Sequence, residues 1–381
     1  MTLNRHGILW QTFSGSLFFL FFMGLATAAP EPPQLDAKSY LLIDFNSGQV
    51  IVQKDPDKRI EPASITKLMS AYVIYAALKE DQIKRTDIVT ISEKAWKMGG
   101  SRMFIEVGKK VSVADLLNGM IIQSGNDATV ALAEHVAGSE DYFVDLMNRK
   151  AVELGMTSSL FQNTTGWPAD DHYMSTRDIS ILSRALIRDF PKEYELYKVK
   201  DFTFNNIPQK NRNSLLWRDD SVDGIKTGHT NAAGYCLVSS ALRDNMRLIA
   251  VVVGAESEKS RADQSMSLLN YGYRFFETRQ LYSAGEAIAK VRVWKGLQDE
   301  VTMGLPEPVH LTFPRGEYDQ LSASIDHPDA LTAPVSLAAP IGTLSIKLGD
   351  RLLYENQLHS LTAVEEAGFF KRLSDSVKSI F

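Results

Sequence analysis

The chain has 381 residues, 44% of them apolar and 23% charged, which is typical of a globular protein with two or three domains. This composition excludes collagen-like, low-complexity and wholly disordered proteins. The net charge of −5 provides no basic excess for a large nucleic-acid interface, so we expect no nucleic-acid partner. The single cysteine, Cys236, excludes a disulfide framework and a cysteine-rich metal site.

Residues 1–28 have the pattern of a secretory signal peptide. Arg5 and His6 form a short basic region, an apolar run follows over residues 17–25, and residues 26–28 (Ala-Thr-Ala) resemble a cleavage site. The alternative is a signal anchor that stays in the membrane, but the apolar run is short for a membrane span. We therefore expect cleavage and an exported protein.

Residues 29–282 mix strand and helix patterns. Strands are predicted at 39–45 and 49–52 around an Asn-Ser-Gly turn, and a β-rich pair at 235–241 and 246–253 predicts an antiparallel hairpin. Apolar residues at helical spacing indicate helices between these strands. An antiparallel sheet flanked by helices predicts an α/β sandwich domain.

The pattern changes after residue 282. Short alternating runs and many turn residues predict a small all-β domain over residues 283–362. Residues 363–381 then predict an amphipathic helix that is too charged to span a membrane and that fits an interfacial membrane anchor. The alternative is a terminal helix packed on the body of the protein. The apolar stripe consists of Phe369, Phe370, Leu373, Val377, Ile380 and Phe381.

A Ser-x-x-Lys step from Ser64 to Lys67 begins a helical pattern. This spacing places both side chains on one helix face, one turn apart. A hydroxyl near a helix N-terminus has free N–H groups beside it that can stabilise an oxyanion, and a neutral lysine amine can take its proton. On its own such a step more often marks an N-cap serine followed by a surface lysine.

Two further motifs strengthen the catalytic interpretation. Ser124-Gly125-Asn126 lies between two helical patterns, and Lys226-Thr227-Gly228 leads into the predicted hairpin. Taken singly, Asn126 could cap a helix and Lys-Thr-Gly could end a strand. Together and in this order, the three motifs correspond to the signature set of penicillin-binding proteins and class A β-lactamases, with glycine replacing aspartate in the middle motif.

With these motifs, the chain resembles the low-molecular-mass penicillin-binding proteins that are D-alanyl-D-alanine carboxypeptidases, over nearly its whole length. The resemblance implies a β-lactamase/transpeptidase-like α/β domain, with an antiparallel sheet sandwiched by helices, followed by a small all-β domain and the amphipathic helix. It also implies removal of the terminal D-alanine from peptidoglycan pentapeptide stems, acylation by β-lactams, no cofactor or metal, and a peripheral position on the periplasmic face of the bacterial inner membrane.

The resemblance further implies a role for each motif residue. Ser64 is expected to be the nucleophile, Lys67 the general base with a depressed pKa to which the nearby Lys226 ammonium contributes, and Ser124 a proton relay to the leaving amine. The backbone N–H groups of Ser64 and His229 are expected to form the oxyanion hole. The expected substrate-binding residues are Asn126, Lys226, Thr227, Gly228, His229, Arg261 and Arg212, of which the two arginines could equally be surface charges.

Some features depart from the relatives or leave alternatives open. No Glu-x-x-Leu-Asn segment lies between Asn126 and Lys226, so efficient β-lactam hydrolysis is not expected. The segment Thr164-Thr165-Gly166 has threonine where many relatives have histidine before the glycine. A β-lactamase or DD-endopeptidase using the same serine remains an alternative. A non-catalytic cell-wall-binding scaffold is another, although such a protein needs none of the intact motif residues.

Overall fold

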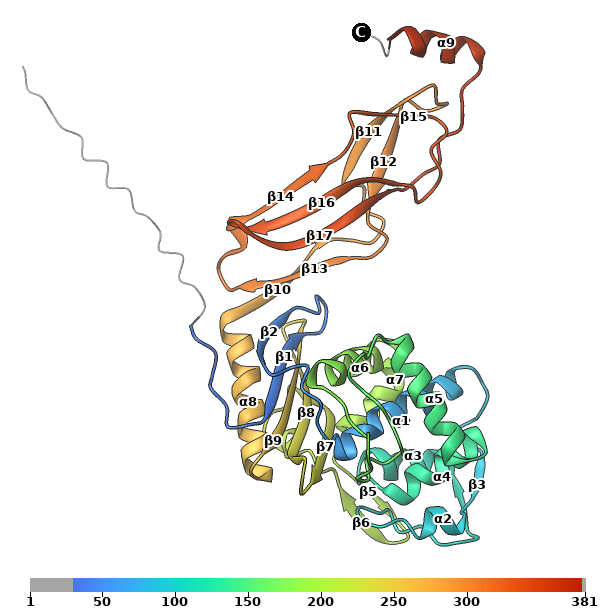
Figure 1. The fold of residues 1–381 in the computed structure, drawn as a ribbon, viewed down its shortest axis with the longest axis vertical. Helices are drawn as coiled ribbons and strands as arrows, with labels where there is room; N and C mark the ends of the chain where they lie inside the picture. The colour runs from blue at the N-terminus through green and yellow to red at the C-terminus, as the bar shows by residue number, and fades with distance from the viewer. Residues whose placement is uncertain (1–29, 379–381) are drawn as a thin grey trace, which may run out of the picture.

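A computed structural model describes residues 30–378, so the expected signal peptide and the last three residues of the chain lie outside the described residues. Figure 1 shows an α/β domain and an elongated β domain, which meet at the end of the long helix α8 (Glu258–Phe275). Helix α9 (Phe369–Lys378) lies at the far end of the β domain, away from the α/β domain.

The α/β domain is built on a five-stranded antiparallel sheet in the order β2-β1-β9-β8-β7. Both predicted hairpins are confirmed, and β7 forms one edge of the sheet. The strands are β1 (Ser39–Asp44), β2 (Val50–Lys54), β7 (Val222–Thr230), β8 (Gly234–Arg243) and β9 (Met246–Ala255).

Alternate residues of this sheet enter two separate cores. Leu41 and Ile43 of β1 join a core with the helical part of the domain, whereas Leu42 joins a second core beneath α8. Strand geometry explains this division, because successive side chains point to opposite faces of a sheet. Figure 1 shows α8 on one face of the sheet and the other helices of this domain on the opposite face, which is the predicted sandwich.

The helical part surrounds α1 (Lys67–Lys79), which is buried on almost every side. Ser64 was expected to open this helix, but it lies in a 3₁₀ turn, Ala63–Thr66, and the α-helix begins only at Lys67. The backbone explains the correction, since Ala63 has a φ of 47° and the chain therefore enters the turn from a left-handed residue. The other helices are α2 (Glu93–Trp96), α3 (Val113–Ile121), α4 (Asn126–Ala137), α5 (Glu140–Glu153), α6 (Thr176–Asp189) and α7 (Pro191–Tyr194).

Two small hairpins flank these helices. The first pairs β3 (Ile88–Thr90) with β4 (Lys110–Ser112), and the second pairs β5 (Asp201–Phe204) with β6 (Ile207–Lys210). Residues 99–105 lie in the long segment between β3 and β4, and Arg212 follows β6 by two residues. Both contribute to the site described below.

The β domain contains a six-stranded sheet in the order β14-β16-β17-β12-β11-β15 and the pair β10-β13. Strand β10 falls within the range that sequence analysis placed in the first domain, yet it pairs with β13 from Phe276 onward. The sequence gives no turn signal between α8 and β10, which is why this strand was misplaced. The strands are β10 (Phe276–Tyr282), β11 (Ala289–Trp294), β12 (Glu300–Gly304), β13 (Val309–Pro314), β14 (Leu321–Asp326), β15 (Ala330–Thr332), β16 (Pro340–Leu348) and β17 (Arg351–Ser360).

Buried polar groups join the two domains. The fully buried Asp44 accepts hydrogen bonds from the Ser47 hydroxyl (2.9 Å) and the Thr278 hydroxyl (2.8 Å). The Thr312 hydroxyl lies 2.7 Å from that of Ser47 and 2.8 Å from that of Thr278, which closes a ring of hydrogen bonds around the carboxylate. Because Ser47 follows β1 and the two threonines lie in β10 and β13, this ring ties the β domain to the central sheet.

Helix α9 contacts the β domain through its polar side. The Asp375 carboxylate accepts the Lys295 backbone N–H (2.7 Å), and Lys371 pairs with Asp299 (2.8 Å). The apolar stripe faces away, with Phe369 and Phe370 74% and 86% exposed. Among the helices of the described chain, none is long and apolar enough to cross a membrane.

Candidate active site

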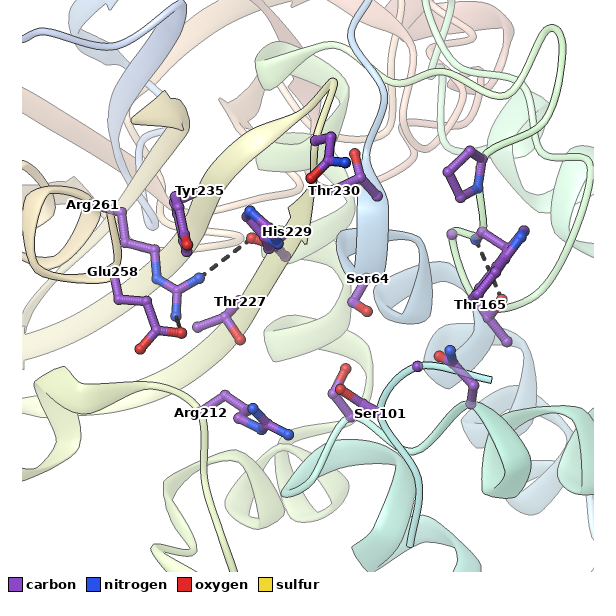
Figure 2. A pocket seen from close by; sticks show the side chains of 18 residues that line it. Ser64, Ser101, Thr165, Arg212, Thr227, His229, Thr230, Tyr235, Glu258 and Arg261 are labelled. Carbon is purple, nitrogen blue, oxygen red and sulfur yellow. Dashed lines mark hydrogen bonds and ion pairs between the residues drawn. The ribbon is translucent and has the colours of Figure 1, made fainter. Parts of the chain in front are cut away.

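The three sequence motifs converge on one cleft of about 500 Å³ in the α/β domain. Ser64, Ser124 and Thr227 all line it, although 60 and 103 positions of sequence separate successive members. Figure 2 shows Ser64 in the middle of this cleft. A Cβ atom on Gly228 would lie 3.1 Å from the Pro62 carbonyl oxygen, so glycine allows β7 to approach the Ser64 turn closely.

The Ser-x-x-Lys step brings its two functional groups together as predicted. Lys67 Nζ lies 3.0 Å from Ser64 Oγ. Ser64 lies in the 3₁₀ turn that leads directly into α1, three residues before the first residue of the helix. This is the arrangement expected of a serine nucleophile and its base.

Lys67 is fully buried, and its surroundings favour the neutral amine. Its Nζ also lies 2.7 Å from Asn126 Oδ1 and 2.8 Å from the Thr165 carbonyl oxygen. Burial lowers the pKa of Lys67 to about 7, against an opposing effect of the Asp127 carboxylate. A neutral amine has two N–H groups, which the Asn126 and Thr165 oxygens can accept, so its lone pair is left to receive the Ser64 proton.

Lys226 and Ser124 form the second lysine–serine pair. Lys226 Nζ donates hydrogen bonds to Ser124 Oγ (2.8 Å) and to the Thr227 carbonyl (3.0 Å). Ser124 has a φ of 65°, an uncommon backbone conformation for a residue with a side chain, and such strain is found disproportionately at functional sites. The two serines of the motifs thus each contact a buried lysine.

The pKa of Lys67 is depressed, as expected. Burial is the main cause of the depression, to which the charge of Lys226 was expected to contribute. The pKa of Lys226 is itself lowered well below its usual range by burial and then by the charges of Lys67, Arg261 and Arg212. Burial is thus the main cause of the lowered pKa at both lysines.

Asn126 and Asp127 fix the wall of the cleft at the start of α4. The Asn126 amide donates to the Gly99 carbonyl (2.8 Å) while its oxygen accepts from Lys67. The buried Asp127 carboxylate accepts the backbone N–H groups of Met103 (2.9 Å) and Phe104 (2.9 Å). These bonds anchor the segment from residue 99 to 105, which also contributes Ser101 to the cleft.

One end of the cleft is cationic. Arg261 and Arg212 line it together with Thr227 and His229, as Figure 2 shows. Arg261 is 5% exposed, and its guanidinium is 3.4 Å from the Gly228 carbonyl and 3.5 Å from the carboxylate of Glu258. Glu258 is the single acidic residue among those that line the cleft, so this end can accommodate an added carboxylate.

The segment from Asn163 to Trp167 forms the opposite wall. Asn163 Oδ1 accepts the backbone N–H groups of Thr165 (3.1 Å), Gly166 (2.8 Å) and Trp167 (3.1 Å). Gly166 has a φ of +84°, and a Cβ atom there would lie 1.7 Å from the Ala63 carbonyl oxygen, so no other residue fits. The Thr165 contact with Lys67 uses the backbone carbonyl and is therefore independent of the threonine that replaces histidine.

Sequence reasoning missed Asp127 and Asn163, which hold these two walls. Asp127 directly follows the middle motif, and its position in the first turn of a helix was an available signal. Asn163 had a weaker signal, since an asparagine three residues before a glycine is typical of a side-chain-stabilised turn. Neither residue belongs to the three motifs, so the motif search passed over both.

Two family models match the chain. The one described as D-alanyl-D-alanine carboxypeptidase (peptidase S11) matches residues 26–257, and the one described as penicillin-binding protein 5, C-terminal domain, matches residues 276–366. The D-alanyl-D-alanine carboxypeptidase DacA of Escherichia coli K12 is 44% identical over 367 residues, covering 94% of this chain and 91% of that protein. The second match begins at Phe276, the first residue of β10.

Solved structures give the same result. Penicillin binding protein 5 from Haemophilus influenzae superposes with a TM-score of 0.86 at 42% identity, covering 88% of this chain and 99% of that one. Penicillin-binding protein D2 from Listeria monocytogenes, in its ampicillin-bound form, matches with a TM-score of 0.59 at 26% identity. The latter covers 64% of this chain and 99% of its own.

Proposed function

The chain belongs to the peptidase S11 family of D-alanyl-D-alanine carboxypeptidases, and we propose that it uses Ser64 to remove the terminal D-alanine from peptidoglycan pentapeptide stems. It is a penicillin-binding serine hydrolase with the penicillin-binding-protein fold. The observation that carries the assignment of Ser64 is its 3.0 Å contact with the buried amine of Lys67.

The proposed reaction has two halves. In acylation, Lys67 takes the Ser64 proton as Ser64 Oγ bonds to the carbonyl carbon of the penultimate D-alanine. The resulting oxyanion is held by the backbone N–H groups of Ser64 and His229. The amide C–N bond then breaks, and the departing amine receives its proton through Ser124. Water hydrolyses the remaining ester and restores the Ser64 hydroxyl.

Substrate orientation follows from charge. The carboxylate of the terminal D-alanine would lie at the cationic end, against Thr227, Arg261 and Arg212, with Lys226 behind them. A carboxylate beside Lys226 favours its charged form and would reverse the depression of its pKa. Asn126 and Gly228 would contact the peptide on either side of Ser64. These positions support the assigned substrate-binding roles.

Two measurements on one sample test this function. The purified protein is incubated with a labelled penicillin and, separately, with a D-Ala-D-Ala-terminated pentapeptide, while protein mass and released D-alanine are followed. We expect one adduct per chain and steady D-alanine release, both lost in Ser64→Ala. The matched control is Ser101→Ala, since Ser101 also lines the cleft but has no lysine three residues later. Absence of both adduct and release would refute the proposal.

We also propose that the protein is exported through its signal peptide and is bound to the periplasmic face of the inner membrane by α9. The family's peptidoglycan substrate supports export. The outward apolar stripe of α9 supports the anchor over a helix packed on the body, because its aromatic side chains have no protein surface to cover. Intact-mass analysis of the native protein should give a chain that begins after Ala28. Deletion of residues 365–381 should move the protein from the membrane to the soluble fraction.

A further inference from the structure

We propose that Glu258 extends the substrate range of the cleft to stem peptides whose leaving D-amino acid has a side chain that ends in an ammonium group, as D-lysine does. The inference rests on the carboxypeptidase function proposed above and names a second class of leaving residue for the same site. It concerns an acidic side chain to which the reaction with D-alanine gives no part.

Glu258 lies at the end of the cleft that would receive the leaving residue. It lines the same cavity as Ser64, and its side chain is 71% exposed. Figure 2 shows it beside Arg261, on the same side of Ser64 as Arg212. Among the described residues that line the cleft it is the single acidic one, so a positive group on a ligand meets its counter-charge only here.

The surroundings of Glu258 leave its carboxylate available to a ligand. The carboxylate lies 3.5 Å from the Arg261 guanidinium, which is longer than the usual charge-assisted hydrogen bond of about 2.8 Å. Within residues 30–378 the Glu258 side chain accepts no hydrogen bond. Arg261 has other contacts, because its guanidinium donates to the Gly228 carbonyl (3.4 Å) and lies 5.6 Å from the centre of the Tyr235 ring.

The position of Glu258 at the start of α8 explains its charge only in part. A carboxylate in the first turn of a helix is favoured by the helix dipole. The dipole would be served equally by an acidic residue at position 259 or 260, and neither of these positions lines the cleft. The placement of the acid at position 258 therefore adds a negative charge to the cleft itself.

This charge has opposite effects on two kinds of leaving residue. The α-carboxylate of any leaving residue would bind Arg261, so Glu258 repels it and weakens the binding of D-alanine. A cationic side chain on that residue would be repelled by Arg261, Arg212 and Lys226, and Glu258 offsets this repulsion. The same carboxylate thus opposes the ordinary leaving residue and favours one with an ammonium group.

One leaving residue can reach both charged groups. Its α-carboxylate and the Glu258 carboxylate would share the Arg261 guanidinium, so the two anions lie close together. A lysine side chain is about 6 Å long from Cα to Nζ. It can therefore bring its ammonium to Glu258 while the α-carboxylate remains on Arg261.

The test compares three tripeptides that share the acyl part, Nα,Nε-diacetyl-Lys-D-Ala, and end in D-alanine, D-lysine or D-norleucine. All three give the same acyl-enzyme, so differences in kcat/KM arise while the leaving residue is still bound. D-Norleucine is close to lysine in length but has no charge on its side chain. Pairs of tripeptides compete in one reaction, and mass spectrometry of the released amino acids gives the ratio of their kcat/KM values.

The wild type should prefer D-lysine over D-norleucine by about fivefold, the upper range for an exposed ion pair. Glu258→Gln should abolish this preference and raise kcat/KM for D-alanine by about twofold, because the repulsion of the α-carboxylate is removed. Glu256→Gln is the matched control, since Glu256 is an exposed glutamate two residues earlier that does not line the cleft. It should leave all three kcat/KM values unchanged.

The outcomes separate this inference from the function on which it rests. Should the wild type release no amino acid from any of the three tripeptides, the proposed function fails. Should it release D-alanine without preferring D-lysine over D-norleucine, or should Glu258→Gln keep the full preference, the role of Glu258 is refuted and the function stands. A parallel loss on all three tripeptides in Glu258→Gln would also refute this role, since it indicates general damage to the cleft.

Discussion

The active-site cleft and helix α9 depart from the usual distribution of polarity in opposite directions. In the cleft, two lysines lie inside the protein without a carboxylate within ion-pair distance among the described residues. In α9, Phe369 and Phe370 lie on the protein surface with most of their area exposed to solvent. Both arrangements work against folding, because the burial of an ionisable amine without an ion-pair partner and the exposure of aromatic groups to water are unfavourable. Under the functions proposed above, each would become favourable through an external partner, a stem peptide in one case and a lipid surface in the other.

The largest effect should come from placing a permanent cation at position 67. In Lys67→Arg the guanidinium does not lose its proton in the accessible pH range and cannot serve as the base. We expect the rate of acylation by penicillin to fall by about 10³-fold, as measured by quenched-flow mass spectrometry. Lys79→Arg, at the exposed end of the same helix, should leave the rate unchanged. A fall of less than tenfold in Lys67→Arg would assign the base elsewhere.

The second effect concerns the exposed phenylalanines. Phe370→Glu places a charge within the apolar stripe, so binding to anionic lipid vesicles should weaken by about 30-fold. Leu352→Glu is the control, since Leu352 is also exposed and lies in β17 of the same domain. Co-sedimentation with vesicles measures both variants. Equal losses in the two would indicate that charge alone governs binding and that α9 is not the anchor.

These two regions also show how far sequence reasoning reached. The contact between Ser64 and Lys67 follows from helical spacing alone, even though the helix starts three residues later than expected. The contact between Lys226 and Ser124 joins residues 102 positions apart. The family resemblance placed both residues in one site, but it did not predict this contact. The contact of the Thr165 carbonyl with Lys67 could not be predicted. Every residue has a backbone carbonyl, so residue type does not show which of them accepts a hydrogen bond. Periodicity likewise predicted the apolar stripe of α9 but not which side would contact the β domain.

The third prediction uses the pH dependence of the cleft. The pKa of Lys67 is about 7 and its neutral form is the active one, so kcat/KM should rise with pH through about 7 and fall about tenfold per unit below it. The Asp127 carboxylate favours the charged form. Asp127→Asn should therefore move the rising limb of the pH–rate profile to lower pH. It should also reduce the maximal rate, because an amide cannot accept all the backbone N–H groups whose hydrogen bonds Asp127 accepts.

Stopped-flow acylation across pH 5–9 measures the limb. Asp145→Asn, an exposed carboxylate of α5, serves as the control and should leave both the limb and the maximal rate unchanged. A limb that stays in place or moves to higher pH in Asp127→Asn would contradict the electrostatic role of Asp127. Loss of rate without any shift would leave it only the structural role of holding residues 103 and 104.

The smallest effect is expected where the α/β domain and the β domain are joined. Thr278→Val removes one hydrogen bond to the buried Asp44 and should lower the free energy of unfolding by about 1 kcal/mol in urea titrations. Thr332→Val, an exposed strand position in β15, should change it by less than half of that amount. Soluble tripeptides should be cleaved at the wild-type rate by Thr278→Val, since the cleft is not part of this ring. A reduced rate on vesicle-bound substrate alone would mean that the Asp44 ring orients the cleft relative to α9, and an unchanged stability would mean that Ser47 and Thr312 satisfy Asp44 without Thr278.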